Sequence, residues 1–194
     1  MIYEETYQFL LHNVSSTEFD ACLYSLLKTD WDGVIQTSAQ QIAEQIGTTK
    51  KYMKQIIKKF SVKRSRKVLV PVTTENRVSY ALNIGKHSNL GFNEKTDLYC
   101  KKYSFFYTEA FRSLPINAKR LLLMGAFRMS VLKSEEVKFD YNEIVPNTYR
   151  EGNSFFTRGR LIEAIQAIQE SKLSDVVRVS LASRLSLCRN EVIL

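Results

Sequence analysis

The stretch AQQIAEQIGTTKKYMKQIIKKF, residues 39–60, decides the fold of the first half of this chain. Its second part has apolar residues at positions i, i+3, i+4 and i+7, namely Met53, Ile56, Ile57 and Phe60. That spacing predicts a helix with one apolar side. Gly47 is typical of the residue that ends a helix in a left-handed conformation, and Thr48 or Thr49 is suited to cap the helix that follows. We therefore expect two helices joined by a tight turn.

The second of these helices begins a strongly basic region. Between Gln45 and Thr74 there are nine basic residues and no acidic one. The nine are Lys50, Lys51, Lys54, Lys58, Lys59, Lys63, Arg64, Arg66 and Lys67. On a helical wheel, the residues opposite the apolar side are Lys51, Lys54, Gln55 and Lys58. A helix that is apolar on one side and cationic on the other predicts an anionic partner.

Two further elements are predicted before this pair of helices. Ser15 followed by Glu18 has the pattern of a capping box, and apolar residues then recur at helical spacing for about three turns. The turn signal at residues 31–33 precedes residues 34–37, which are predicted as a short strand. Ser38 is placed to cap the helix that begins at the next residue.

Two β-rich runs follow the basic helix. They are residues 67–72 and 77–83, and the polar residues 73–76 between them predict a hairpin. Pro71 places the first strand at the edge of its sheet, because proline has no N–H to donate to a neighbouring strand. Residues 84–97 are polar and rich in helix breakers, which predicts a connector between two domains.

The second half of the chain begins with an aromatic segment, residues 99–111, which is interpreted as a helix packed on a core or as a surface for a partner. Core packing is favoured over a stacking platform for single-stranded nucleic acid. Residues 118–131 are predicted to form a central helix, because apolar residues cover more than one of its sides. A short strand is predicted at residues 137–139 and a helical turn at residues 141–145.

After a polar loop at residues 147–154, Thr157 is placed to cap another amphipathic helix. Its apolar residues again follow the i, i+3, i+4, i+7 spacing and are Leu161, Ala164, Ile165 and Ile168. Two β-rich runs, residues 175–182 and 184–193, predict a second hairpin. The order of helix, strand, short helix, longer helix and hairpin therefore occurs twice along the chain.

Three helices followed by a two-stranded hairpin resemble the winged-helix family of DNA-binding domains, and the resemblance rests on residues 38–83 with the first helix added. It implies that the helix from Thr48 to Lys59 enters the major groove of DNA. It also implies that Glu75–Arg77 forms the wing tip, which touches the backbone or the minor groove. The second half resembles the family only in the order of its elements.

The expected fold is therefore α+β and mainly helical, with two winged-helix units in tandem. The resemblance implies a DNA-binding N-terminal domain at residues 1–84, a connector at residues 85–98, and a divergent winged-helix-like domain at residues 99–194. Such a tandem arrangement is suited to recognise two stretches of one site.

The charge pattern and the resemblance together give the candidate DNA-binding residues of the first half. Those on the basic helix are Thr48, Thr49, Lys50, Lys51, Tyr52, Lys54, Gln55 and Lys58. Lysines neutralise phosphates, glutamine can pair with adenine, and lysine can pair with guanine. The candidates after the helix are Lys63, Arg64, Arg66 and Lys67 for the backbone, and Asn76 and Arg77 for the minor groove. The alternative is a solvated lysine surface and an ordinary hairpin turn.

The second half has fewer candidates. Those for DNA contact are Arg150, Asn153, Arg158 and Arg160. Along the polar side of the same helix, however, lie Glu163, Gln166 and Glu170, and carboxylates repel phosphate. Either only the first turn of this helix meets DNA, or this half serves a partner protein or a homodimer. Residues 100–194 hold 15 basic and 10 acidic side chains, which favours the first reading.

Composition limits the class of protein further. The chain has 194 residues, 44% hydrophobic content and a net charge of +8, which is enough for one or two cores and favours an anionic partner. The longest strongly apolar run, residues 121–127, is too short to cross a bilayer, and the acidic N-terminus is unlike a secretory signal. Three unpaired cysteines predict reduced thiols in a cytoplasm.

The residue patterns of catalytic and metal sites are missing from the sequence. Its two histidines have no cysteine or second histidine at metal-ligand spacing, and there is no phosphate-binding glycine loop or nucleophile motif. We therefore expect no enzymatic activity, no metal and no cofactor.

The sequence thus predicts a cytoplasmic, nucleoid-associated protein that binds specific double-stranded DNA, as a transcriptional regulator of a bacterial or mobile genetic element. Two alternatives stay open. One is a plasmid or phage replication initiator, since such proteins resemble this chain in carrying paired winged helices that grip origin repeats. The other is a protein-interaction module whose basic side binds an acidic protein.

Overall fold

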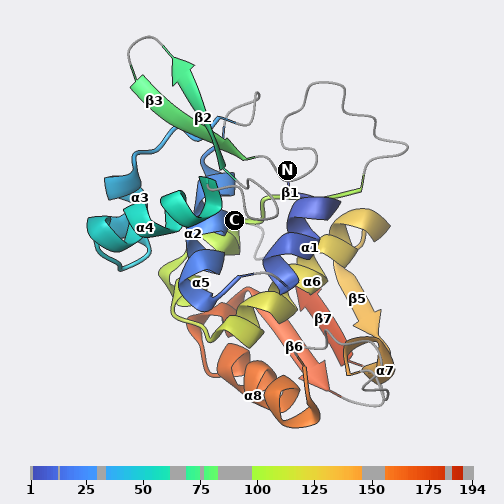
Figure 1. Ribbon diagram of the computed structural model, residues 1–194. Coiled ribbons are helices and arrows are strands. Elements are labelled where there is room, and N and C mark those ends of the chain that lie inside the picture. The colour runs from blue at the N-terminus through green and yellow to red at the C-terminus, as the bar shows by residue number, and fades with distance from the viewer. Residues whose placement is uncertain are drawn as a thin grey trace. The chain divides into compact units, whose positions relative to one another are not determined.

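The computed structural model describes most of the chain. The described residues are 2–12, 14–29, 34–61, 69–74, 77–82, 98–145, 156–181 and 185–189. They are mainly helical with a few short antiparallel strands, and the chain divides into two compact units, Met1–Lys102 (unit 1) and Tyr103–Leu194 (unit 2) (Figure 1). None of the described helices is both long and apolar enough to cross a membrane.

Unit 1 contains four described helices. They are α1 (Glu4–His12), α2 (Ser16–Leu27), α3 (Ala39–Gln45) and α4 (Lys50–Ser61). Apolar spacing predicts the last three and misses α1. The apolar residues of α1 are crowded into its second half, so no repeated spacing marks it as a helix, yet Tyr7, Leu10 and Leu11 are buried in the unit.

The pairing of the N-terminal strand determines where the first unit ends. Strand β1 (Ile2–Tyr3) pairs antiparallel with β4 (Tyr99–Cys100), and the backbone N–H of Glu4 donates to the carbonyl of Leu98 at 3.2 Å. This pairing ties residues 98–102 to the first unit, so the division between the two compact units falls after Lys102 and not at the start of the domain expected from residue 99. The predicted connector up to residue 97 lies outside the described residues.

The helices of unit 1 begin with the predicted caps. A Glu18 carboxylate oxygen accepts a hydrogen bond from the backbone N–H of Ser15 at 2.9 Å, as a capping box requires. At the start of α3, the Ser38 hydroxyl accepts from the backbone N–H of Gln41 at 3.2 Å. Each bond satisfies a donor that the first turn of a helix leaves without an intrahelical partner.

Strand signals in unit 1 are confirmed in part. The hairpin consists of β2 (Leu69–Thr74) and β3 (Arg77–Leu82), and Pro71, opposite Tyr80, lies in a two-stranded sheet in which every strand is an edge. The predicted four-residue connection 73–76 is too long, because β-favouring Thr73 and Thr74 extend the ladder. The strand predicted at residues 34–37 is reduced to a single bridge between Ile35 and Thr29.

Unit 2 begins with an aromatic cluster instead of one helix. Residues 99–111, interpreted from the sequence as a helix packed on a core or as a surface for a partner, are divided among β4, a 3₁₀ turn η1 (Ser104–Tyr107) and the short helix α5 (Glu109–Arg112). Phe105, Phe106 and Phe111 are buried, and the ring centroids of Phe105 and Phe106 lie 4.4 Å apart. Core packing is therefore the role of these rings.

Helix α6 (Ile116–Leu132) is the central helix of unit 2, as predicted. Leu121, Leu122 and Leu123 are three consecutive residues and all are fully buried, so the helix is enclosed on more than one side. Lys119, on the same helix, is also buried, which apolar spacing does not predict for a lysine.

A three-stranded antiparallel sheet completes unit 2. Its strands are β5 (Glu136–Phe139), β6 (Val177–Leu181) and β7 (Leu185–Arg189), in the order β5-β7-β6. Helices α7 (Tyr141–Ile144) and α8 (Arg158–Gln169) lie between β5 and β6 in the chain, as predicted. The strand predicted from residue 175 starts at Val177, because Lys172–Asp175 form a second 3₁₀ turn, η2.

Candidate nucleic-acid interface

Helix α4 presents two chemically different sides. Met53, Ile56, Ile57 and Phe60 are all buried, and the Phe60 ring meets the Phe9 ring edge-on with centroids 6.0 Å apart. Burying side chains of this size stabilises the helix by about 1.5–3 kcal/mol each. The exposed residues on α4 are Lys50, Lys51, Tyr52, Lys54, Gln55, Lys58 and Lys59. The apolar side therefore fixes the helix, and its lysines are exposed to solvent.

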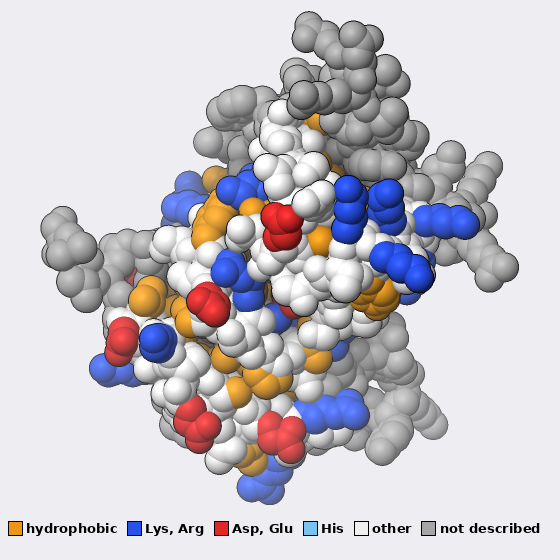
Figure 2. All heavy atoms as spheres, turned by 90° about the vertical axis from the view of Figure 1, so that its left-hand side faces the viewer, with side chains coloured by type: hydrophobic (Ala, Val, Ile, Leu, Met, Phe, Trp, Pro, Cys, Tyr) orange, Lys and Arg blue, Asp and Glu red, His pale blue; other side chains and the backbone are white. Residues whose placement is uncertain are grey.

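The basic character of this region is visible on the surface. Figure 2 shows Lys and Arg side chains gathered on part of the face that, in Figure 1, carries α3 and α4. Helix α4 supplies five lysines and no acidic residue, and like charges this close together raise the local positive potential. A surface of this kind attracts a polyanion before any specific contact forms.

The N-terminal end of α4 is set by the turn from α3. Gly47 has φ +69°, the left-handed conformation that ends α3, and the backbone N–H of Thr48 donates to the carbonyl of Ala43 at 2.9 Å. The Thr49 hydroxyl then accepts from the backbone N–H of Tyr52 at 3.1 Å and caps α4. Both predicted residues therefore lie at the start of α4, where the backbone N–H groups of a helix lack intrahelical partners. Thr48 is half-buried and Thr49 is exposed.

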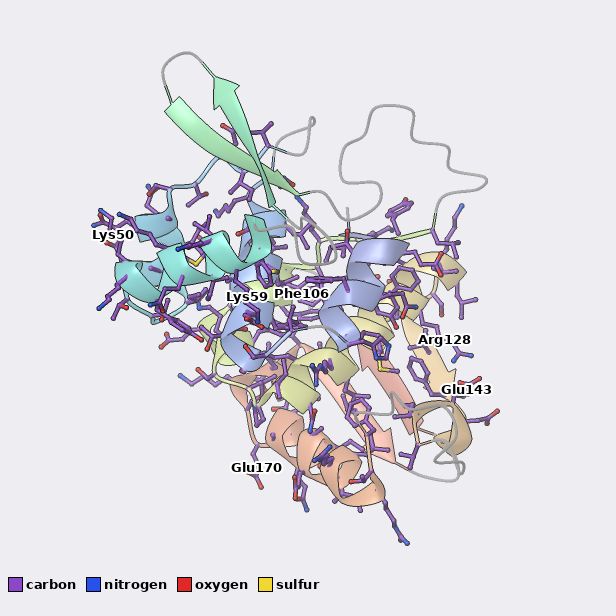
Figure 3. All side chains as sticks on the ribbon, in the orientation of Figure 1. Lys50, Lys59, Phe106, Arg128, Glu143 and Glu170 are labelled. Atoms are coloured by element: carbon purple, nitrogen blue, oxygen red, sulfur yellow. The ribbon has the colours of Figure 1, made fainter. Side chains whose placement is uncertain are left out.

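Two exposed side chains of the first turn have different environments. Lys50 donates from Nζ to the Gln40 side-chain oxygen on α3 at 3.1 Å, and Gln40 in turn donates to Glu44 at 3.0 Å. Figure 3 shows Lys50 at the outer end of α4. Tyr52, in contrast, is 42% exposed, so that an aromatic ring stands among the lysines of this turn.

The C-terminal end of α4 is tied to α2 by an ion pair. Lys59 Nζ donates to Oε1 of Glu18, whose other oxygen accepts from Ser15. Burial raises the pKa of the Glu18 carboxyl, but the hydrogen bonds from Lys59 and Ser15 outweigh this and hold the pKa below its ordinary value of 4.5. Lys59 therefore has a partner within its own unit, which counting lysines along the sequence does not show.

Several candidates from the sequence cannot be placed in this way. Those outside the described residues are Lys63, Arg64, Arg66, Lys67, Asn76, Arg150 and Asn153. Arg77 begins β3, opposite Thr74, and only its backbone is described. The candidates that the structure brings together are thus those on α4.

In unit 2, Arg158 and Arg160 are exposed in the first turn of α8, where the Thr157 hydroxyl accepts from the backbone N–H of Arg160 at 3.3 Å. Glu163, Gln166 and Glu170 are exposed further along this helix or at its end. The outer side of α8 is therefore cationic only at its beginning.

The charge balance of residues 100–194 also overstates the positive surface of this half of the chain. Lys119 is only 1% exposed, and Arg120 is partly buried, so that burial lowers the pKa of its guanidinium group. Of the 15 basic side chains counted between residues 100 and 194, Lys119 therefore adds almost nothing to the exposed surface and Arg120 adds only in part.

Unit 1 has a further cation that sequence patterns miss. Lys102 is partly buried and donates from Nζ to the Thr29 hydroxyl at 3.5 Å, and burial lowers the pKa of its ammonium group. Nothing in the sequence marks it, because Lys102 lies 43 residues beyond the last lysine of α4.

Other kinds of site receive no support from the described residues. Among them, no group of three His, Cys, Asp or Glu side chains is placed to hold a metal ion. Cys22 and Cys100 are buried thiols that form no disulfide among the described residues, and burial raises the pKa of Cys22 far above its usual range. No protein-family model, curated protein or solved structure matches the chain.

Proposed function

We propose that this protein binds double-stranded DNA through the exposed side of α4. The observation that carries the proposal is the division of one helix into a buried apolar side and an exposed side with lysines and no carboxylate. A helix of this kind fits the major groove, where ammonium groups reach the phosphates on both walls.

The exposed residues have distinct roles in this proposal. Lys50, Lys54 and Lys58 contact phosphates and release counterions, which gives affinity without sequence preference. Lys51, Tyr52 and Gln55 lie nearer the N-terminal half of the helix and read base edges. Glutamine pairs with adenine and lysine with guanine, and an aromatic edge contacts the methyl group of thymine.

We further propose that both units are winged helices. The order of elements in unit 1 is α2, α3, α4 and the β2–β3 hairpin, and in unit 2 it is α6, β5, α7, α8 and the β6–β7 hairpin. These orders support the proposal, as does the position of α4 and α8 immediately before a hairpin. In unit 2, Arg158 and Arg160 would contact a phosphate beyond the stretch that α4 reads.

The proposed biological role is transcriptional regulation in a bacterium or a mobile genetic element, with the protein in the cytoplasm on the nucleoid. Genomic footprinting tests it against replication initiation. Binding at promoters is the expected result, whereas a single peak over repeats at a replication origin would assign the protein to plasmid or phage replication.

The decisive test of DNA binding is the triple variant Lys51→Ala, Gln55→Ala and Lys58→Ala. These side chains are exposed, so we expect loss of DNA retention with an unchanged circular dichroism spectrum. The matched control is Lys133→Ala with Lys172→Ala, which also removes two exposed positive charges but lies in unit 2. Unchanged affinity of the triple variant would end the assignment of α4.

A salt series separates specific DNA binding from a protein-interaction module that binds any acidic partner. Specific binding is expected to survive near physiological salt with a preference over random duplex of at least about a thousandfold. Attraction by charge alone collapses as salt rises, because counterion release is then the whole driving force. Loss of all preference at physiological salt would favour the interaction module.

A further inference from the structure

The carboxylate of Glu18 accepts hydrogen bonds from two different elements of unit 1. Its Oε2 accepts from the backbone N–H of Ser15 and caps α2, while its Oε1 accepts from Lys59 Nζ on α4. The Glu18 side chain is 8% exposed, compared with 62% for Lys59. One buried carboxylate therefore links the start of α2 to the end of the proposed DNA-reading helix, where Lys59 is labelled in Figure 3.

This ion pair divides the lysines of α4 into two groups. Successive residues of a helix differ by about 100° around its axis, so Lys58 and Lys59 point in different directions although they are neighbours in the chain. In the part of the chain that the structure describes, Lys59 is the α4 lysine with a carboxylate partner. The charge of Lys59 is thus partly balanced by a carboxylate of its own unit although the side chain is exposed, whereas Lys58 is exposed on the side opposite the core.

We propose that Glu18 is a positioning residue for DNA recognition. Through Lys59 it holds α4 at a fixed angle to α2, and it removes Lys59 from the set of lysines that contact phosphate. This inference rests on the proposed function of α4. It adds that specificity depends on a residue that touches no DNA.

Positioning and simple charge predict opposite results for Glu18→Gln. Glutamine can replace glutamate in a capping box, so the variant keeps the cap of α2 while it removes the negative charge. If Glu18 acted only through its charge, the variant would bind DNA more tightly, because one repulsion is lost. If Glu18 positions α4, the variant binds its specific site more weakly although its net charge is more positive.

The first experiment measures binding of Glu18→Gln to the specific site and to random duplex at one salt concentration. We expect specific affinity to fall about two- to fivefold, the range for a pair with one exposed partner. Binding to random duplex should stay within about twofold or become tighter, since it depends on total charge. Unchanged or tighter specific binding would overturn the proposal.

The second experiment compares Lys58→Gln with Lys59→Gln, two neighbouring lysines with the same charge and different partners. Lys58→Gln should reduce the slope of log affinity against log salt by about 0.9, the value for one lost phosphate contact. Lys59→Gln should leave the slope unchanged and lower specific affinity as Glu18→Gln does. An equal decrease in slope for the two variants would place Lys59 on the DNA and overturn the inference.

A double-mutant cycle and a measurement without DNA complete the test. The combined variant Glu18→Gln, Lys59→Gln should bind no more weakly than either single variant, because both remove the same link. By NMR, Lys59→Gln should raise the pKa of the Glu18 carboxyl, and Lys58→Gln should not. Absence of DNA binding by the wild-type protein would overturn the proposed function as well, whereas equal salt slopes in a DNA-binding protein would overturn this inference alone.

Discussion

Helices α4 and α8 have the same length and the same internal plan, and they differ in what they show to solvent. Each has 12 residues, follows a capping threonine and buries apolar side chains at i, i+3, i+4 and i+7. On α4 the charged residues are five lysines, whereas on α8 they are two arginines and a glutamate. Apolar spacing thus determines how a helix packs in its unit, and the remaining positions are free to determine its partner.

The largest expected effect tests what α4 and α8 have in common, the packing of their buried apolar sides. Phe60, in α4, is 6% exposed, and Leu161, in α8, is 0% exposed. Phe60→Ala and Leu161→Ala each remove one of these buried side chains. We expect the free energy of unfolding to fall by about 3–5 kcal/mol for the first and about 2–5 kcal/mol for the second. Urea denaturation, with hydrogen exchange to assign the loss to a unit, measures both. A loss below about 1 kcal/mol at either position would mean that the two helices are not packed alike.

The next prediction exchanges the exposed charges in which α4 and α8 differ. Glu163→Lys with Glu170→Lys gives α8 an outer side like that of α4, and we expect tighter binding to random duplex with a salt slope steeper by up to about 1.8. The reciprocal variant, Lys54→Glu with Lys58→Glu, should weaken binding on the same measurement. If the reciprocal variant left DNA affinity unchanged, charge on the outer side of these helices would not choose the partner.

A smaller effect is expected from the caps. Thr49→Ala and Thr157→Ala each remove a hydroxyl that accepts from a backbone N–H of the first helical turn. Each should lower the free energy of unfolding by about 1 kcal/mol. Thr49→Ala should also lower specific DNA affinity, and by more than Thr157→Ala, since it loosens the base-reading end of α4 whereas α8 is proposed to contact only a phosphate. Equal effects on specific DNA affinity would mean that α8 contributes to recognition as much as α4 does.

The smallest prediction concerns pH. The pKa of the Glu18 carboxyl lies below 4.5 in the folded protein, so the stability it contributes is present above its unfolded pKa and is lost as pH falls through the folded value. Wild type should therefore lose more stability between pH 7 and pH 3 than Glu18→Gln does. The difference should be below about 1 kcal/mol because the Lys59 partner is 62% exposed.

Urea midpoints at pH 7, 4.5 and 3 measure this difference. Glu163→Gln serves as the matched control, because it removes an exposed carboxylate from the equivalent helix of unit 2. Identical pH profiles for wild type and Glu18→Gln would show that the ion pair with Lys59 contributes nothing to stability.

The sequence predicts those parts of the molecule that depend on residues close together in the chain. Caps at Ser15, Ser38 and Thr157 are such local features, as are the buried sides of α4 and α8. Each follows from a side chain and a backbone group three residues apart, or from a spacing that a helix alone produces. All five are confirmed in the structure.

Features that depend on distant residues are the ones that sequence patterns miss. The pairing of β1 with β4 joins residues almost a hundred positions apart, and two-residue strands carry no periodic signal. Likewise, the partner of Lys59 lies 41 positions earlier in the chain. The burial of Lys119 depends on what packs around α6, which its own position in the helix does not reveal. The sequence therefore predicts that the candidate interface is a helix with a charged side. It does not predict the contacts with distant residues that hold this helix in place.

The turn between α3 and α4 determines which chirality of amino acid position 47 can accept without strain. At Gly47 an added Cβ would meet nothing within 4 Å, yet φ is +69°. The obstacle to L-alanine there is therefore torsional strain in an L-amino acid and not lack of room for its Cβ. In a mirror-image alanine introduced by chemical synthesis, a φ of +69° is unstrained, and this residue would restrict the unfolded chain more than glycine does.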